Sequence, residues 1–367
     1  ALIKMKGLEK KTKDMPKTKV GPGLKIKSGK NEFKLGGRIH FDVGMYNNDK
    51  GAKCEVNDTT DGSCLVSGTN FRRLRLAMSG KYDDMFYYKA SVDWGASAKQ
   101  GSDATDNASV DEAFLGYKLA KNTTFSIGKQ KMPVAFAEST SSNDMAFIER
   151  APSLDAMTDE TIGPKRMGAQ LRNWDKKMGY LVELGMHGSS DTFSTEQTNE
   201  DFGLGGRIAY APILSKKQVL HLGYWHNKTL VDNRRYGAAS QRGATDLQWN
   251  YRIGLNVADE KFLDMEDDAD DVGGWTDMVH YGAEIAYLMG PAWFQAEWIW
   301  GEFNRDVMSG DTNTFTSYKA DGGYYQFGYV IGSERRYTIK KGGWKAPKVK
   351  NAINKGGTGV HEIALRR

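Results

Sequence analysis

The sequence predicts an all-β fold: a transmembrane antiparallel β-barrel, about 16 strands when complete. Three observations predict this fold. Apolar and polar residues alternate with a period of two in many segments, which is the side-chain period of a strand. Aromatic residues crowd the apolar faces, whereas arginine, lysine and glutamate lie deep within the opposite faces. Long and short connections alternate, as they do in an up-and-down barrel with its long loops at one rim.

The composition excludes some other classes of protein. The 367 residues have a mean hydropathy of -0.59 and contain no run of about 18 apolar residues, which excludes a membrane-spanning helix. The net charge of +5 is too modest to indicate a nucleic-acid-binding face. Glycine is abundant and proline scarce, as expected for curved strands joined by tight turns.

The alternating segments define the expected strands. In the first of them, Ile39 and Phe41 lie on one face while Arg38 and His40 lie on the other. In chain order, strands are expected over 33–46, 71–79, 85–95, 110–119, 124–131, 164–173, 178–187, 202–211, 217–226, 278–289, 292–302 and 323–332, with a last one from near Gly359.

Segment 247–257 alternates most cleanly of all, yet it does not fit the barrel as a spanning strand. If it spanned the membrane, the short turn Gly290-Pro291 would fall on the long-loop side. We therefore predict that 227–277 is one long excursion that contains 247–257 as an extra strand. The chain then stops within a strand at Arg367, so further C-terminal strands are expected to follow.

The chain divides into two parts by composition. Residues 1–32 are rich in lysine and poor in apolar residues, and they predict a solvated basic arm on the periplasmic side. Residues 33–367 carry the alternating pattern and form the expected barrel domain.

Two cysteines lie in the polar loop between the first two strands. In an exported protein, Cys54 and Cys64 could close a small disulfide loop, whereas in a reducing compartment they would be free thiols. Since the chain has no second cysteine pair and no paired histidines at ligand spacing, we expect the disulfide, no metal site and no cofactor.

Cations on the polar faces predict the chemistry of the interior. An arginine facing lipid at the bilayer midplane costs about 2–4 kcal/mol, so these residues should face the lumen. A lumen with fixed positive charge favours anions. The alternative is balance, because carboxylates such as Glu183, Glu284 and Glu297 lie on the same faces and could pair with the cations. The stretch 132–163 lacks alternation and is too long for a plain hairpin, so it reads as a functional loop.

These features predict a porin, a channel for passive diffusion of small hydrophilic solutes across the bacterial outer membrane, with a lean towards anions. Two alternatives stay open: an outer-membrane barrel enzyme and a soluble carbohydrate-binding β-sandwich. We expect no enzyme, because no serine, histidine and acid set or acidic pair stands out in the sequence.

Several segments resemble one known family. They are NEFKLGGRIHFDVGMYNND (31–49), NFRRLRLAMSGKYDDMFYYKASVDW (70–94), VDEAFLGYKL (110–119), FSIGKQKMPVAFAESTSSNDMAFIER (125–150), VLHLGYWHN (219–227), YYQFGYVIGSERRYTIK (324–340) and GGTGVHEIALRR (356–367). In this order they resemble the phosphate-selective porin family, the porin O and porin P group. The resemblance implies a 16-stranded outer-membrane barrel that is trimeric, contacts lipid and lipopolysaccharide, passes anionic or neutral solutes, and narrows its pore with the 132–163 loop.

The resemblance also implies roles for individual residues. Arg72 and Arg73 match the family's paired arginines, and the lysine-rich turn from Arg335 to Lys355 is kept. Where the phosphate porins place a lysine after the glutamate, this chain has Ser139, and this departure favours a general or weakly anion-selective porin. We assign Arg38, Arg72, Arg73, Arg75, Lys89, Lys131, Arg166, Arg207 and Arg252 to the pore lining, and Glu138, Ser139, Asn143, Asp144, Glu149 and Arg150 to the constriction loop.

Overall fold

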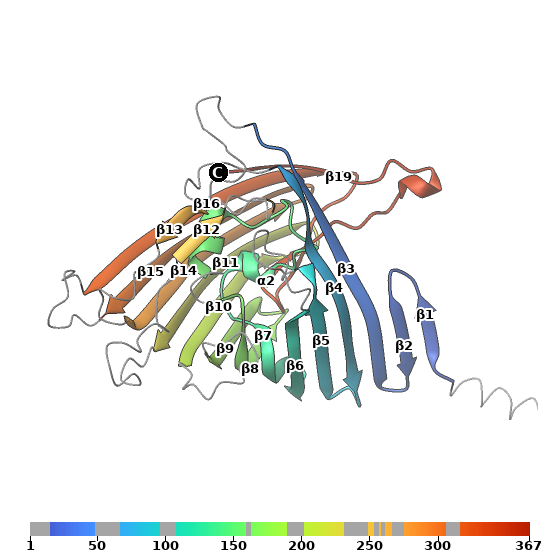
Figure 1. Ribbon diagram of the computed structural model, residues 1–367. Coiled ribbons are helices and arrows are strands. Elements are labelled where there is room, and N and C mark those ends of the chain that lie inside the picture. The colour runs from blue at the N-terminus through green and yellow to red at the C-terminus, as the bar shows by residue number, and fades with distance from the viewer. Residues whose placement is uncertain are drawn as a thin grey trace, which may run out of the picture.

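The computed structural model describes residues 15–47, 67–95, 108–158, 163–188, 202–230, 249–252, 257, 261–265, 275–305 and 316–367. Its main feature is one curved antiparallel sheet of 15 strands, in which each strand pairs with its neighbours in chain order (Figure 1). The predicted all-β fold is confirmed. A complete barrel of about 16 strands stays a prediction.

The long strands match the alternating segments closely. They are β3 (Asn31–Gly44), β4 (Gly68–Tyr82), β5 (Phe86–Asp93), β6 (Ser109–Ala120), β7 (Thr123–Lys131), β8 (Lys165–Asp175), β9 (Tyr180–Gly188), β10 (Phe202–Leu214), β11 (Gln218–Leu230), β14 (Trp275–Met289), β15 (Ala292–Arg305), β16 (Ser317–Ile331) and β19 (His361–Arg366). Short turns join β4 to β5, β6 to β7, β8 to β9, β10 to β11 and β14 to β15, while the other connections between β3 and β16 are long, as predicted.

The N-terminal arm differs from its prediction in part. Strand β1 (Lys17–Val20) pairs with β2 (Leu24–Ser28), and β2 pairs with the first residues of β3. Residues 17–28 therefore extend the sheet at its N-terminal edge and do not form a solvated tail. Their lysines alternate with Val20, Leu24 and Ile26, a short version of the same period-two pattern.

The long excursion is confirmed for the part that the structure describes. Strand β11 pairs directly with β14, so residues 249–252, the described strand within 247–257, lie outside the large sheet. Within the excursion, β12 (Trp249–Arg252) pairs only with β13 (Lys261–Met265). The side chain of Arg252 lies outside the described part of the structure, as do Cys54 and Cys64, so these three assignments stay predictions.

The sheet exposes its apolar rows and buries its polar ones. Along β16, Tyr325, Phe327 and Tyr329 are 46%, 49% and 52% exposed, whereas Gln326 between them is only 9% exposed. A soluble sandwich would show the reverse, with the aromatic row packed inward. Over the described strands this arrangement contradicts the β-sandwich alternative. None of the described helices is long and apolar enough to cross a membrane.

Two connections fold onto the inner face of the sheet. The 132–163 loop forms α2 (Phe136–Ser139) and α3 (Pro152–Thr158). The segment after β16 forms a small hairpin of β17 (Arg336–Thr338) and β18 (Gly343–Lys345), followed by the 3-10 turn η4 (Ile353–Lys355). We call β17, β18 and the turn between them the inner hairpin. The sequence predicted only a lysine-rich turn here, because the polar composition hides the contacts that hold this segment inside.

Candidate functional site

The constriction loop packs against an apolar cluster on the inner face of the sheet. Val134, Ala135 and Leu154 of the loop pack with Trp225 of β11 and Phe303 of β15, and all five side chains are buried. The inner face of the sheet is therefore apolar in this part of the wall. The signal was present in the sequence, since Trp225, Ile299 and Phe303 occupy positions on the polar side of their strands.

Glu297 of β15 fastens the beginning of the loop to the wall. Its two carboxylate oxygens accept hydrogen bonds from the backbone N–H groups of Phe136, at 2.7 Å, and Ala137, at 2.9 Å. The Tyr324 hydroxyl also donates to this carboxylate, and Gln295 donates to it at 3.1 Å. The Glu297 carboxylate thus accepts hydrogen bonds from first-turn N–H groups of α2, which have no partner within the helix.

Glu149 fastens the middle part of the loop to β4. The Arg72 Nε lies 2.7 Å from one of its carboxylate oxygens, and the Arg73 Nη2 lies 3.3 Å from the other. A β-bulge makes this double contact possible. His40 of β3 faces Arg73 and the next residue, Phe41, faces Phe71, so Arg72 is the extra residue of β4. The bulge brings both arginines to the inner side, although strict alternation would place one of them outside.

Glu138 is enclosed by two cations of the constriction. Its side chain is 2% exposed, and Arg150 Nε lies 2.8 Å from one carboxylate oxygen. Lys131, at the end of β7, lies 3.9 Å from the other oxygen and also donates to the backbone carbonyl of Glu138. Lys131, Glu138 and Arg150 therefore form an internally paired cluster.

Arg207 of β10 joins the wall to both inner elements. Its fully buried guanidinium donates to Glu284 at 2.7 and 2.8 Å and lies 3.4 Å from Glu183. It also donates to the Ser139 hydroxyl at 2.8 Å and to the carbonyls of Lys341 and Gly342, at 3.1 and 2.7 Å. The residue predicted to line an anion path is instead saturated with acceptors, and it holds the loop and the inner hairpin together.

Other predicted pore residues are also paired. Arg75 binds Asp93 and lies 3.0 Å from Asp111, and Lys89 binds Glu112. The side chain of Arg166 of β8 packs against Gly163 at the end of the loop. A Cβ added to Gly163 would lie 2.6 Å from the Arg166 Nε.

Arg38 is the exception among these residues. It donates to the hydroxyl of Ser142 in the loop, and in the described part of the chain no carboxylate lies within ion-pairing distance of it. Asn143 of the loop meets His40 of the same strand, with 3.3 Å between Oδ1 and Nε2. Both contacts place the middle of the loop against β3.

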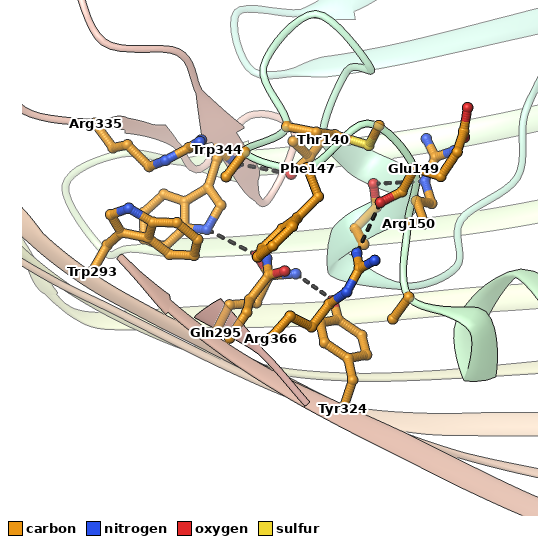
Figure 2. A pocket seen from close by; sticks show the side chains of 15 residues that line it. Thr140, Phe147, Glu149, Arg150, Trp293, Gln295, Tyr324, Arg335, Trp344 and Arg366 are labelled. Carbon is orange, nitrogen blue, oxygen red and sulfur yellow. Dashed lines mark hydrogen bonds between the residues drawn. The ribbon is translucent and has the colours of Figure 1, made fainter. Parts of the chain in front are cut away.

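The inner hairpin is bound to the loop and to the wall. The N–H of Trp344 donates to the Thr140 hydroxyl at 3.1 Å, and its indole N–H donates to Gln295 at 3.0 Å. The N–H of Ala346 donates to the Asp144 carboxylate at 2.9 Å. Figure 2 shows the small pocket that remains between these elements, with Phe147 of the loop facing the wall residues Gln295 and Tyr324.

Two lysines of the inner hairpin supply positive charge without a counter-ion. Lys340 and Lys341 are exposed, and no carboxylate among the described residues lies within ion-pairing distance of either ammonium group. Partial desolvation by the surrounding wall and the positive charge of nearby Arg172 lower the pKa of both lysines. The charge of Lys118 lowers the pKa of Lys340 further. The Lys340 ammonium also lies 4.5 Å from the centre of the Trp174 ring.

The inner charges are thus balanced in most of the constriction and positive beside the inner hairpin. Carboxylates neutralise the arginines of the wall, as the balance alternative predicted, while Arg38, Lys340 and Lys341 keep an excess of positive charge among the described residues.

Comparisons with known proteins agree with this architecture. The family model for phosphate-selective porin O and P matches residues 33–367. Porin O of Pseudomonas aeruginosa is 25% identical over 342 residues, which are 91% of this chain and 72% of that protein. An uncharacterised protein of Caulobacter vibrioides is 27% identical over 352 residues, which are 92% of this chain but only 61% of that protein. The chain therefore spans less than two thirds of the Caulobacter relative.

Among solved structures, the sheet is similar to OmpT, an outer-membrane protein of Vibrio cholerae. A loop L8 deletion mutant of OmpT has a TM-score of 0.37 and 9% identity, covering 92% of this chain and 99% of that one. In vitro folded OmpT in its trimer form has a TM-score of 0.36 and 10% identity, with the same coverage. The match of the family model over residues 33–367 shows the identity of the chain: it belongs to the phosphate-selective porin O and P family of the bacterial outer membrane.

Proposed function

We propose that this chain forms a channel through which small hydrophilic solutes diffuse passively, with a modest preference for anions. The sidedness of the sheet carries the proposal. Apolar rows face outward while charged rows face inward. A space lined by such an inner face can hold water. The loop and the inner hairpin narrow the space inside the sheet.

The charge balance supports a modest preference over a strong one. Carboxylates neutralise most of the inner arginines, so a permeating ion meets them as pairs. Arg38, Lys340 and Lys341 supply the excess positive charge that lowers the barrier for anions.

Selective binding of phosphate is not part of the proposal. A desolvated phosphate needs several charge-assisted donors, and Ser139 offers a neutral hydroxyl that already accepts from Arg207. We expect phosphate to pass without the strong current block that tight binding would cause.

Conductance in planar lipid bilayers tests the function. The purified chain should form stable channels, and the reversal potential in a potassium chloride gradient should favour chloride over potassium. Phosphate added at millimolar concentration should reduce the chloride current only weakly. Absence of channels would contradict the proposed function, and a reversal potential favouring potassium would contradict the anion preference.

Three further expectations stay proposals. We propose that the channel is a homotrimer, that its outer face contacts lipid and lipopolysaccharide, and that the basic arm of residues 1–32 lies on the periplasmic side. Light scattering of the protein in detergent would give the number of chains, and a protease added from one side of oriented vesicles would locate the arm.

A further inference from the structure

Glu149 holds an unusual position, because one carboxylate serves two neighbouring arginines. Each of its oxygens accepts from both guanidinium groups. The Nε and Nη2 of Arg72 lie 2.7 and 3.4 Å from the carboxylate oxygens, and the Nη1 and Nη2 of Arg73 lie 3.4 and 3.3 Å from them. Glu149 and Arg73 are 8% and 4% exposed. Their charges are therefore poorly screened by water, and each strongly affects the other.

A second carboxylate completes the cluster. Asp42 of β3 is 7% exposed and interacts electrostatically with Arg72, Arg73 and Glu149. Two arginines thus face two carboxylates, and the sum of the four charges is close to zero. Without Glu149, the buried guanidinium of Arg73 and the half-buried guanidinium of Arg72 would share Asp42 and leave a net positive charge at the loop.

The backbone around Glu149 is held independently of its carboxylate. Arg366 of β19 donates to the Glu149 carbonyl at 2.8 Å, and its guanidinium lies 4.4 Å from the centre of the Phe147 ring. The Asp144 carboxylate accepts from the N–H of Ala346. Removal of the Glu149 charge therefore leaves other contacts that keep this part of the loop against the wall.

We propose that Glu149 determines the ion preference of the channel, because its carboxylate neutralises Arg72 and Arg73 and withholds their charge from permeating ions. The proposal rests on the proposed channel function. Glu149 then sets how strongly the channel favours anions. In the wild type, Arg72 and Arg73 contribute little to the ion selectivity because their charges are neutralised.

Reversal potentials of single variants test this role. Glu149→Gln keeps the size and an acceptor oxygen but removes the charge, so the anion-to-cation permeability ratio should rise by about a factor of two or more. Glu149→Asp keeps the charge and should give the wild-type ratio. Glu302→Gln is the matched control, since Glu302 lies at the loop end of β15, pairs with Lys319 at 3.5 Å and is 38% exposed in its side chain.

A combined variant identifies the source of the gain. Adding Arg72→Gln and Arg73→Gln to Glu149→Gln should return the ratio towards the wild-type value, because the uncovered charge is then gone. An unchanged ratio in conducting Glu149→Gln channels would overturn the proposal. A larger conductance with a ratio closer to one would also overturn it, since the loop would then have been released. Failure of the channel function itself would show differently, as absent conductance in the wild type.

Discussion

Arg207 shows how one residue can combine two inner elements with the wall. Its guanidinium is fully buried and bound to Glu284, and it also binds the Ser139 hydroxyl and the carbonyls of the inner hairpin. Gly342, which provides one of these carbonyls, has a φ of 56°, and a Cβ there would lie 2.8 Å from the Arg207 Nη1. The hairpin can approach Arg207 this closely only with glycine at this position.

We predict that Arg207→Met strongly destabilises the protein. Glu284 would lose its counter-ion inside the protein, and removal of one partner of a buried ion pair costs about 3–5 kcal/mol. Unfolding in urea, followed by tryptophan fluorescence in detergent, should show this loss. Arg172→Met is the control, because Arg172 is 25% exposed in its side chain and should cost clearly less. Equal losses in the two variants would contradict the role of Arg207.

A pH dependence follows from the lysines of the inner hairpin. Partial desolvation by the surrounding wall, together with neighbouring cations, lowers the pKa of Lys340 and Lys341 below the ordinary lysine value of 10.5. They lose their protons as the pH rises through that lowered pKa, earlier than lysines far from other cations and from the wall, so the anion preference should fall over this alkaline range. Reversal potentials measured from about pH 7 to about pH 10, a range below the ordinary lysine pKa, would show the decline. Lys340→Met with Lys341→Met should remove it, and a decline that persists in this double variant would contradict the assignment.

At the scale of elements, periodicity predicted the strands well and the inner elements poorly. Each long strand has a period of two because one face meets an apolar and the other a polar environment, and this constraint acts on every residue. The bulge at Arg72 adds a single residue and leaves no pattern in the sequence. The inner hairpin is hidden for another reason: it is held by Arg207, Thr140 and Gln295, which come from distant parts of the chain.

The candidate site was predicted in the same uneven way. The sequence marked 132–163 as a functional loop, because a long non-alternating stretch is visible in one chain, and the family resemblance implied that this loop narrows the pore. The sequence did not show which charges would pair. Glu149 and Arg73 are 76 residues apart in the sequence, and only the fold brings them together.

We predict that the inner hairpin narrows the pore. Replacing residues 336–345 by a short glycine and serine linker should raise the single-channel conductance, because Trp344 and the lysine turn would no longer occupy the interior. The measurement is conductance in symmetric potassium chloride. Replacing the exposed 3-10 turn at Ile353–Lys355 in the same way is the control, as it lacks buried residues. Equal conductance of both variants and the wild type would contradict a narrowing role.

At the scale of the whole molecule, the sheet is inverted relative to a soluble protein. Tyr210 and Tyr224 are both 50% exposed on the outer face, while Arg207 and Trp225 are buried inside. An outer face of this kind is favourable only against hydrocarbon, and the inner charges are favourable only with partners or water. Family membership, the proposed channel and the inferred role of Glu149 are all consistent with this arrangement.

A charge placed on the outer face should therefore be costly. Leu222→Arg, in the middle of β11, would set a guanidinium against the hydrocarbon, at a cost of about 2–4 kcal/mol. Urea unfolding of the protein in lipid vesicles would show this loss. The same substitution at exposed Lys348, which already carries a charge, should cost nothing measurable. A Leu222→Arg variant as stable as the wild type would argue against lipid contact at this row.

The most direct test of the account is the accessibility of spin labels placed one at a time at residues 323–331 of β16 in lipid vesicles, with both native cysteines replaced by serine. Labels at Tyr325, Phe327 and Tyr329 should collide with oxygen dissolved in the lipid and not with a water-soluble nickel reagent, and labels at the intervening residues should lack this oxygen contact. Odd-numbered positions shielded from both reagents would mean that the aromatic row packs against more protein, which contradicts a lipid-facing sheet and the channel inside it.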